Sequence, residues 1–381
     1  MKSFLQFLQR AAKYFRGTKR VWRKPPQTKL LIIDQGTASP LDEMFAEHNP
    51  HVMAIRGESI NMLALLRALP KIHLGALAYV EAYIDFVKPK LILSRTDNNP
   101  TMWQLKRRPN ATYQVALVQN GWRLEAGFEI PQLLNETGPF GAWEIDQLFA
   151  FGPAWISQIP NYAKFNGVSS GSIKANQFTN ESRSDVASGI SWISTFRSGY
   201  IAAKNDIGDL FYKNFAKVLK LSGQKLKVIG FESGVAQHHQ ENEYFNNYFK
   251  TQDLTLNRRT SSKSSYELVQ SATIVLTDQS SLGYESLVLG CKTGFIAAAP
   301  RYQITHRFGK PLEFGEKGPF WTNDPSEAEI GRILDYLLTV SDEQWERDSG
   351  WIRDQLMAYD FGNTKIRAYV ESVLADSLKD N

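Results

Sequence analysis

The sequence has one cysteine among 381 residues, Cys291, so it excludes an internal disulfide and argues against a cysteine-based metal site. It has no run of 18 or more apolar residues, so no segment is expected to span a bilayer. Neither an HExxH motif nor a carboxylate-rich metal motif occurs. We therefore expect a cytoplasmic protein of a reducing compartment that binds no metal and no cofactor.

Acidic residues are missing from residues 1–24, which contain eight lysines and arginines. This segment has a charge of +8, so the rest of the chain has 5 − 8 = −3. Apolar residues recur in it at helical spacing, namely Phe4, Leu5, Leu8, Ala11, Ala12 and Phe15. The pattern predicts a basic amphipathic helix attached peripherally to the anionic inner face of the cytoplasmic membrane. The alternative is a tail that packs on its own protein. The mildly acidic remainder gives no basic stripe for a nucleic acid partner.

The rest of the chain has ordinary globular composition, with 43% hydrophobic and 22% charged residues, and is long enough for two domains. Predicted strands alternate with predicted helices, which indicates an α/β fold with parallel sheets. The strands are expected at 29–33, 90–93, 113–118, 147–151, 189–194, 225–231, 273–277 and 293–297. The helices are expected at 58–69, 75–87, 199–221, 242–250, 264–270, 282–289, 326–340 and 342–378.

A stretch rich in Pro, Gly, Ser and Asn separates two similar halves, with a boundary near 177–188. We predict an N-terminal domain over 25–180, a C-terminal domain over 181–345 and a closing helix over 346–381. Open α/β sheets bind ligands at the carboxyl ends of their strands. The two halves are therefore expected to face each other across a cleft lined by their strand ends.

One strand end in the second half has the pattern of a phosphate site. The apolar run 273–277 stops at Asp278, and a predicted helix begins a few residues later. The first turn of a helix has unpaired N–H groups and the positive end of the helix dipole, which together suit a phosphate. The residues predicted to hold a nucleotide here are Asp278, Ser280, Ser281, Gly283 and Glu285. The alternative is that Ser281 only caps the helix.

Two other groups in the second half are candidates for the same nucleotide. Glu232 follows the strand at 225–231, and Arg259 can pair with a diphosphate or lie on a solvated face. His238 and His239 are phosphate contacts or solvated residues, and they lack metal-ligand spacing.

The strand ends of the first half supply candidates for acceptor binding and catalysis. Asp97 is a candidate general base, and its alternative role is to cap the next helix. Glu58 is a second candidate base. The predicted acceptor-binding residues are Asn98, Asn120, Gly121 and Arg123, the last of which can also be a plain surface arginine.

The segment VLTDQSSLGYESLVLGCKTGFI resembles the strand-Asp-x-Ser-Ser-x-x-x-Glu-helix segment of bacterial surface-polysaccharide transferases related to CDP-glycerol glycerophosphotransferases. It is also similar to the double-serine motif of capsule polysialyl- and Kdo-type transferases. The stretches RGE at 56–58, DNN at 97–99 and QNGWR at 119–123 resemble proteins of surface carbohydrate biosynthesis. The resemblance covers roughly residues 29–310. The His-Pro pair usual in the capsule enzymes is absent from GFESGVAQHH.

The resemblance implies a GT-B-like fold, with two Rossmann-like domains and the nucleotide held by the C-terminal one. It implies a metal-independent glycosyltransferase of capsule or lipopolysaccharide assembly. The donor is then a nucleotide-sugar or a CDP-polyol, and the acceptor a saccharide or a lipid-linked saccharide. A nucleotide-sugar 2-epimerase on the same fold and a non-catalytic nucleotide-binding assembly factor are the alternatives.

Overall fold

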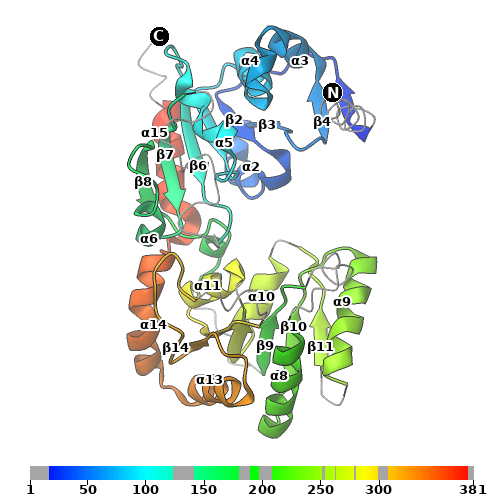
Figure 1. Cartoon of the computed structure of the whole chain (residues 1–381). Coiled ribbons are helices and arrows are strands. Elements are labelled where there is room, and N and C mark those ends of the chain that lie inside the picture. The colour runs from blue at the N-terminus through cyan, green and yellow to red at the C-terminus, as the bar shows by residue number, and fades with distance from the viewer. Residues whose placement is uncertain are drawn as a thin grey trace.

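The structure is a computed structural model of the 381-residue chain. It describes residues 17–122, 141–179, 189–196, 208–250, 254–261, 263–278, 280–298 and 308–375. These residues form two α/β lobes that lie one above the other in Figure 1, each built on its own sheet. The predicted α/β fold with parallel sheets is confirmed.

The first lobe has a six-stranded parallel sheet in the order β3-β2-β5-β6-β7-β8. Its strands are β2 (Leu30–Ile33), β3 (His51–Met53), β5 (Leu91–Ser94), β6 (Gln114–Val118), β7 (Glu144–Ala150) and β8 (Lys164–Ser169). Its helices are α2 (Leu41–Met44), α3 (Met62–Ala68), α4 (Ala76–Val87), α5 (Pro100–Trp103) and α6 (Pro153–Ile156). A separate pair of strands, β1 (Lys19–Val21) and β4 (Ser59–Asn61), lies at its outer end.

Both faces of this sheet are buried, which explains why its central strands are continuous apolar runs. Alternate residues of β2 point to opposite faces. Leu31 packs in the core that includes α4, whereas Leu30 packs in a smaller core with α15 (Thr364–Ala375). The last helix of the chain therefore belongs to the first lobe (Figure 1).

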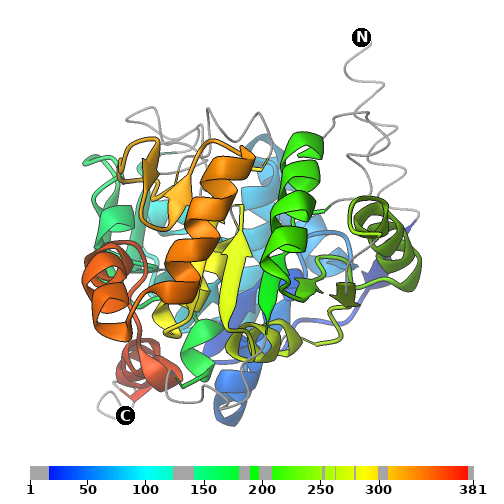
Figure 2. The ribbon, with the colours of Figure 1, turned by 90° about the horizontal axis from the view of Figure 1, so that it is seen from below.

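The second lobe has a seven-stranded sheet in the order β11-β10-β9-β12-β13-β15-β14, parallel except for β14. Its strands are β9 (Ile190–Ile193), β10 (Leu226–Ile229), β11 (Leu254–Asn257), β12 (Ile274–Thr277), β13 (Lys292–Ile296), β14 (Lys317–Gly318) and β15 (Trp321–Thr322). Its helices are α8 (Asp209–Ser222), α9 (Val235–Tyr248), α10 (Ser264–Gln270), α11 (Ser281–Val288), α13 (Glu327–Thr339) and α14 (Asp342–Leu356). In Figure 2, α13 and α8 lie side by side, where Lys217 pairs with Glu327 at 2.6 Å.

Several predicted helices differ from the structure. The helix expected over 58–69 begins at Met62, because residues 59–61 form β4. Within the helix expected over 199–221, α8 begins at Asp209. The helix expected over 342–378 is two helices, because Gly362 has φ +74 and Asp360 accepts a hydrogen bond from the backbone N–H of Lys365. This break lets α15 return to the first lobe. The helix expected over 242–250 begins earlier, at Val235.

No described helix is both long enough and apolar enough to cross a membrane. The predicted helix of residues 1–24 falls mostly on residues 1–16, outside the described residues. Its last part is described, and residues 19–21 are a strand there rather than a helix.

Candidate functional site

The strand-to-helix junction after β12 has the local geometry expected from the sequence, shifted by one residue. Ser280 has an extended backbone, and its hydroxyl accepts a hydrogen bond from the N–H of Leu282 at 3.3 Å. Ser280 is therefore the residue that caps α11, and the alternative that Ser281 is only the cap does not hold. This leaves the Ser281 hydroxyl available for a contact with the first lobe.

A cavity of about 170 Å³ lies where the two lobes meet, and we call it the lobe-junction cavity. The first lobe lines it with Asn120 after β6 and with Ser172 after β8. The second lobe lines it with the first turn of α11. Ser280, Ser281 and Glu285 all lie on its wall, which is where the sequence analysis expected a ligand.

Glu285 connects the two lobes inside this cavity. It is only 6% exposed, and one carboxylate oxygen accepts a hydrogen bond from the hydroxyl of Ser172 in the first lobe. The other oxygen accepts a hydrogen bond from the hydroxyl of Tyr266 at 2.8 Å. Burial, and then the nearby Glu285, raise the pKa of Tyr266, so its phenol stays a donor. Each carboxylate oxygen has a second lone pair, so Glu285 can still accept from a ligand hydroxyl.

The wall of the cavity has three cations and a single carboxylate, Glu285, so positive charge is in excess. The cations are Arg95, Lys174 and Arg259. Arg95 is 6% exposed, its guanidinium donates to the carbonyl of Ser39, and its Nε has no hydrogen-bond partner among the described residues. Burial lowers the pKa of Arg95, and nearby Tyr266, Glu285 and Asp97 oppose the shift.

Lys174 experiences the same excess of positive charge. Burial lowers its pKa, the neighbouring Arg95 lowers it further, and Glu285 acts in the opposite direction. A buried cation that is held beside another cation favours an anionic ligand, because the ligand compensates both charges. The lobe-junction cavity therefore suits a group with more than one negative charge, such as a phosphate or diphosphate.

The loop after β6 closes one side of the cavity. The backbone N–H of Trp122 donates to the Ser281 hydroxyl at 2.9 Å. The Trp122 ring stacks on Tyr284 of α11, with ring centroids 3.3 Å apart and an interplanar angle of 5°. Asn120 lines the cavity as predicted for a ligand-facing loop, and Gly121 connects it to Trp122. Arg123 lies outside the described residues.

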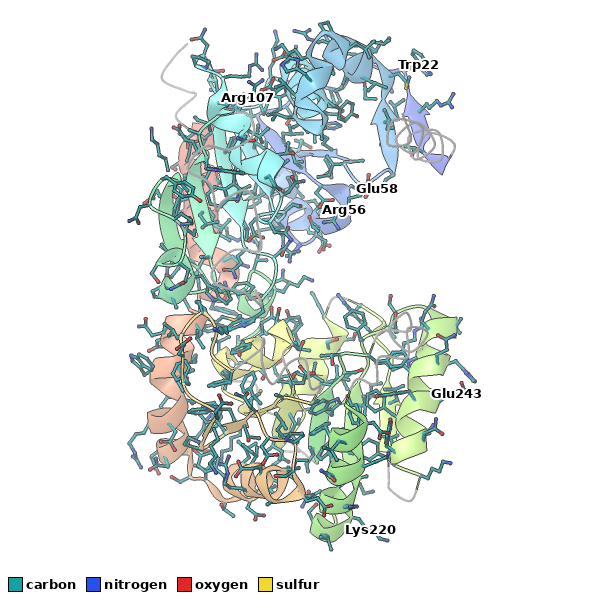
Figure 3. The ribbon with its side chains drawn as sticks, in the orientation of Figure 1. Trp22, Arg56, Glu58, Arg107, Lys220 and Glu243 are labelled. Atoms are coloured by element: carbon teal, nitrogen blue, oxygen red, sulfur yellow. The ribbon has the colours of Figure 1, made fainter. Side chains whose placement is uncertain are left out.

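The two candidate bases lie off the cavity wall. Asp97 is fully buried at the end of β5, and its carboxylate accepts a hydrogen bond from the backbone N–H of Asn120 at 3.1 Å. Glu58 is exposed on the first lobe beside Arg56 (Figure 3) and accepts a hydrogen bond from the backbone N–H of Arg56 at 3.0 Å. In this geometry Asp97 holds the Asn120 loop in place. A base function for either carboxylate stays a prediction.

The other residues chosen from the sequence have separate positions. Asp278 is buried at the end of β12, with its carboxylate 3.4 Å from the Thr195 hydroxyl. Glu232 is half-buried and its N–H donates to Glu241. Asn98 is exposed beside the loop after β5. None of these three lines the lobe-junction cavity.

Gly283 has a packing role in this structure. A Cβ there would lie 2.4 Å from Cγ2 of Thr277, so the glycine lets α11 pack closely on its own strand. His238 and His239 lie on α9, because this helix begins seven residues earlier than the sequence pattern predicts, and they do not line the cavity.

Of the three cations that give the cavity its charge, Arg259 was predicted from the sequence, whereas Arg95 and Lys174 were not. Arg95 stands in a polar stretch after a predicted strand, and Lys174 lies in the stretch rich in Pro, Gly, Ser and Asn, just before the predicted boundary. The available signal was the position of Arg95 at a strand end facing the cleft. Among the described residues, Glu47, His48 and Glu371 lie close enough together to share a metal ion, but they are outside this cavity. The expectation of no metal and no cofactor stays a prediction.

Comparisons with known proteins point to one family and one fold. The model of a family described as "putative O-antigen biosynthesis protein" matches residues 116–374. No curated protein matches the chain significantly. Several solved structures are similar in fold at low sequence identity.

One is a structure of MnaA from S. aureus with UDP, at 12% identity and a TM-score of 0.56, covering 91% of this chain and 97% of that chain. A variant of the wall teichoic acid polymerase TagF has 10% identity and a TM-score of 0.56, covering 94% and 91%. The UDP-GlcNAc 2-epimerase from Neisseria meningitidis, bound to UDP-GlcNAc, has 11% identity and a TM-score of 0.51, covering 91% and 99%. The two-lobed GT-B-like fold expected from the sequence is confirmed.

Proposed function

The chain belongs to the family described as "putative O-antigen biosynthesis protein", and from this premise we propose that it is a glycosyltransferase of bacterial surface polysaccharide assembly. It transfers a sugar, or a polyol phosphate, from a nucleotide-activated donor to a saccharide or lipid-linked acceptor. An acceptor hydroxyl forms the new bond, its proton goes to a base, and the nucleotide leaves with the electron pair of the broken bond.

The observation that carries this proposal is the charge of the lobe-junction cavity. Arg95 and Lys174 from the first lobe face the first turn of α11, with Arg259 on the same wall. The leaving group of a nucleotide-activated donor gains negative charge as its bond breaks. Fixed cations and helix-terminus N–H groups stabilise that charge in a site with little water. The departure of the nucleotide then needs no bound metal.

The similar structures support the choice of ligand. One contains UDP, another is a teichoic acid polymerase, and a third contains UDP-GlcNAc. We therefore propose a nucleotide donor for this chain, with the nucleotide end near Ser280, Ser281 and Glu285. The remaining residues predicted from the sequence, Asp278 and Glu232 among them, are not needed for this contact.

Calorimetry with CMP, CDP, UDP, GDP and dTDP tests the donor site. The variant Glu285→Ala removes the carboxylate that joins Ser172, Tyr266 and the cavity wall. We expect it to weaken the tightest nucleotide by at least tenfold, about 1.4 kcal/mol. The control is Glu243→Ala, because Glu243 is an exposed carboxylate on α9, far from the cavity (Figure 3). Equal affinity in wild type and Glu285→Ala would refute the assignment.

A transfer assay tests whether the bound nucleotide marks an enzyme. We expect one of Asp97→Asn and Glu58→Gln to abolish transfer while nucleotide affinity persists. If both variants keep wild-type transfer, neither is the base. If the wild-type protein binds a nucleotide but transfers nothing to any saccharide or lipid-linked acceptor, a non-catalytic assembly factor is the better description.

A nucleotide-sugar 2-epimerase is the second candidate, favoured by the epimerase among the similar structures. Epimerisation at C2 needs no acceptor and exchanges the C2 proton with solvent. NMR of UDP-GlcNAc incubated with the protein in D₂O distinguishes the two functions. Deuterium at C2 without an acceptor would favour the epimerase, and its absence together with acceptor-dependent loss of donor would favour the transferase.

We further propose that the protein is cytoplasmic and that residues 1–24 attach it to the anionic inner face of the membrane. The eight cations of this segment, with no acid among them, support the proposal. Since residues 19–21 form β1, the experiment deletes residues 1–16 only, so that this strand stays intact. We expect the deletion to weaken binding to anionic vesicles, with circular dichroism as the check on folding.

A further inference from the structure

The outer end of the first lobe has large apolar side chains in solvent. Trp22 is 62% exposed, and Leu66 and Leu69 are each 50% exposed. Leu66 is on α3, and Leu69 begins the short 3₁₀ segment that continues it, so a spacing of three puts both on the same side. The opposite side of α3 is buried through Ala64 and Ala68.

Backbone pairing and a side-chain hydrogen bond hold Trp22 next to this helix. β1 pairs with β4 in parallel, with Val21 opposite Asn61. The Asn61 side chain caps α3 and also donates to the carbonyl of Arg23 at 2.7 Å. Trp22 therefore lies between Val21 and Arg23, which both contact Asn61 at the beginning of α3. Figure 3 labels Trp22 at this end of the lobe.

The segments that build this end of the lobe contain cations and no acids. Residues 17–33 and 59–80 have no aspartate or glutamate. Their lysines and arginines are Lys19, Arg20, Arg23, Lys24, Lys29, Arg67 and Lys71. Acids of α4 pair with two of them: Asp85 lies 3.3 Å from Arg67, and Glu81 lies 4.0 Å from Lys71.

One basic residue from each segment lies near the ring of Phe86. The Lys24 ammonium lies 5.9 Å and the Arg67 guanidinium 5.2 Å from the ring centroid of Phe86, which is partly buried on α4. Cations and apolar side chains thus form one surface, which we call the β1–α3 face. It consists of Trp22, Leu66 and Leu69 with Arg20, Arg23, Lys24 and Arg67.

We propose that the β1–α3 face docks on the surface of an anionic phospholipid bilayer. A tryptophan and two leucines suit the boundary between headgroups and acyl chains, while lysine and arginine attract anionic headgroups. A basic surface around an apolar centre, on which Asp85 of α4 pairs with Arg67, is complementary to such a membrane and not to a mixed-charge protein surface. The proposal is independent of the donor site, which lies at the lobe junction, away from this outer end (Figure 1).

A fluorescent probe on the full chain tests this contact directly. The variant Leu66→Cys is labelled with an environment-sensitive dye, and the native Cys291 does not react because it is 3% exposed. The matched control is Leu221→Cys, which is 87% exposed at the far end of the second lobe, next to Lys220 (Figure 3). We expect vesicles containing phosphatidylglycerol to shift the Leu66 probe to the blue and to leave the Leu221 probe unchanged.

Vesicle affinity of the full chain gives a second readout. We expect Trp22→Ala combined with Leu66→Gln and Leu69→Gln to weaken binding to anionic vesicles about tenfold. The control Trp351→Ala removes a tryptophan that is 61% exposed on α14 and is expected to change nothing. Arg20→Gln with Arg23→Gln is expected to weaken binding to anionic vesicles but not to pure phosphatidylcholine.

Three outcomes would overturn the proposal. The first is wild-type vesicle affinity in the triple variant. The second is a chain that binds vesicles without any blue shift at position 66, which leaves residues 1–16 as the only contact. The third is a blue shift that depends on protein concentration and not on vesicles, which makes the face an interface between two copies of the chain.

Discussion

Lys174 and Arg95 are two cations in the lobe-junction cavity, with Glu285 as the carboxylate between the lobes. Because burial and Arg95 lower the pKa of Lys174, this lysine loses its proton at a lower pH than an ordinary lysine does. A bound anion favours the charged form. The affinity for a nucleoside diphosphate is therefore expected to fall as the pH rises through the lowered pKa.

Lys174→Met and Lys174→Arg test this expectation by calorimetry over a range of alkaline pH. We expect Lys174→Met to weaken CDP or UDP binding by about tenfold, or ~1.4 kcal/mol, at neutral pH. In Lys174→Arg the alkaline loss of affinity is expected to disappear, because a guanidinium stays protonated. An identical pH profile in wild type and Lys174→Arg would show that another group titrates.

Asp34 is a buried carboxylate at the end of β2 with a left-handed backbone, φ +84. Burial alone would raise its pKa, but hydrogen bonds from Arg56, Thr96 and Thr37 lower it below the usual value. Because the folded-state pKa is depressed, Asp34 stabilises the fold above the pKa of the unfolded chain. This stabilisation is lost as the pH falls through the folded-state value.

Asp34→Asn removes this charge while keeping a residue type that tolerates a left-handed backbone. We expect the free energy of unfolding to fall by about 1–3 kcal/mol at neutral pH. The difference between variant and wild type is expected to shrink as the pH falls below about 4. Urea denaturation across this range measures it. A constant difference at every pH would mean that the charge of Asp34 makes no contribution.

At the scale of elements, the packing of α11 on its own sheet fixes the first turn at the cavity. In Gly283→Ala, the new Cβ would lie 2.4 Å from Cγ2 of Thr277 and 3.2 Å from Cε1 of Phe295. We expect this overpacking to cost about 1–3 kcal/mol of stability. The control is Gly331→Ala in α13, where a Cβ meets nothing within 4 Å. Alanine is expected to stabilise that helix by about 0.5–1 kcal/mol.

Thermal unfolding measured by circular dichroism separates the two glycine variants. A Gly283→Ala protein as stable as wild type would show that α11 can shift away from β12 without cost. In that case the first turn of α11 would not be held by the strand. A Gly331→Ala protein that loses stability would show that the loss in Gly283→Ala comes from something other than the close approach.

The elements that could be predicted from the sequence are those with a strong local pattern. The strand LLII and the helix at 264–270 are unambiguous, because one is continuously apolar and the other is bounded by polar residues. The strands β8 and β11 were missed, since KFNGVS and LTLN have few apolar residues and lie at sheet edges. Edge strands have a pairing partner on one side only, and these two are half-buried or exposed, so their sequences hold a weaker apolar signal.

The candidate site was predictable only in part for a related reason. Ser280, Ser281 and Glu285 stand in one segment, so their spacing could be read directly. Arg95 and Lys174 come together with them only after both lobes fold. Burial lowers the pKa of both residues, and Arg95 lowers the pKa of Lys174 further. Neither the burial nor the distance between the two cations can be read from a linear sequence.

At the scale of the whole molecule, the described residues begin and end on the same lobe. After α14, the segment 357–363 turns back, and α15 packs Ile366, Val370 and Leu374 against the core of the first sheet. The first lobe is therefore complete only when the last helix has been added. A change in α15 should affect the first lobe more than the second.

Ile366→Ala tests this dependence, since Ile366 is fully buried in the core that includes Leu30. We expect the loss of packing to cost about 2–5 kcal/mol. Hydrogen exchange is expected to lose protection first in β2 and β5, whereas β9 and β12 keep theirs. The matched control is Ile330→Ala, a fully buried isoleucine in α13 of the second lobe, which should reverse this pattern. If both variants lowered protection equally in both sheets, the lobes would unfold as one unit, and α15 would stabilise the molecule as a whole rather than its first lobe.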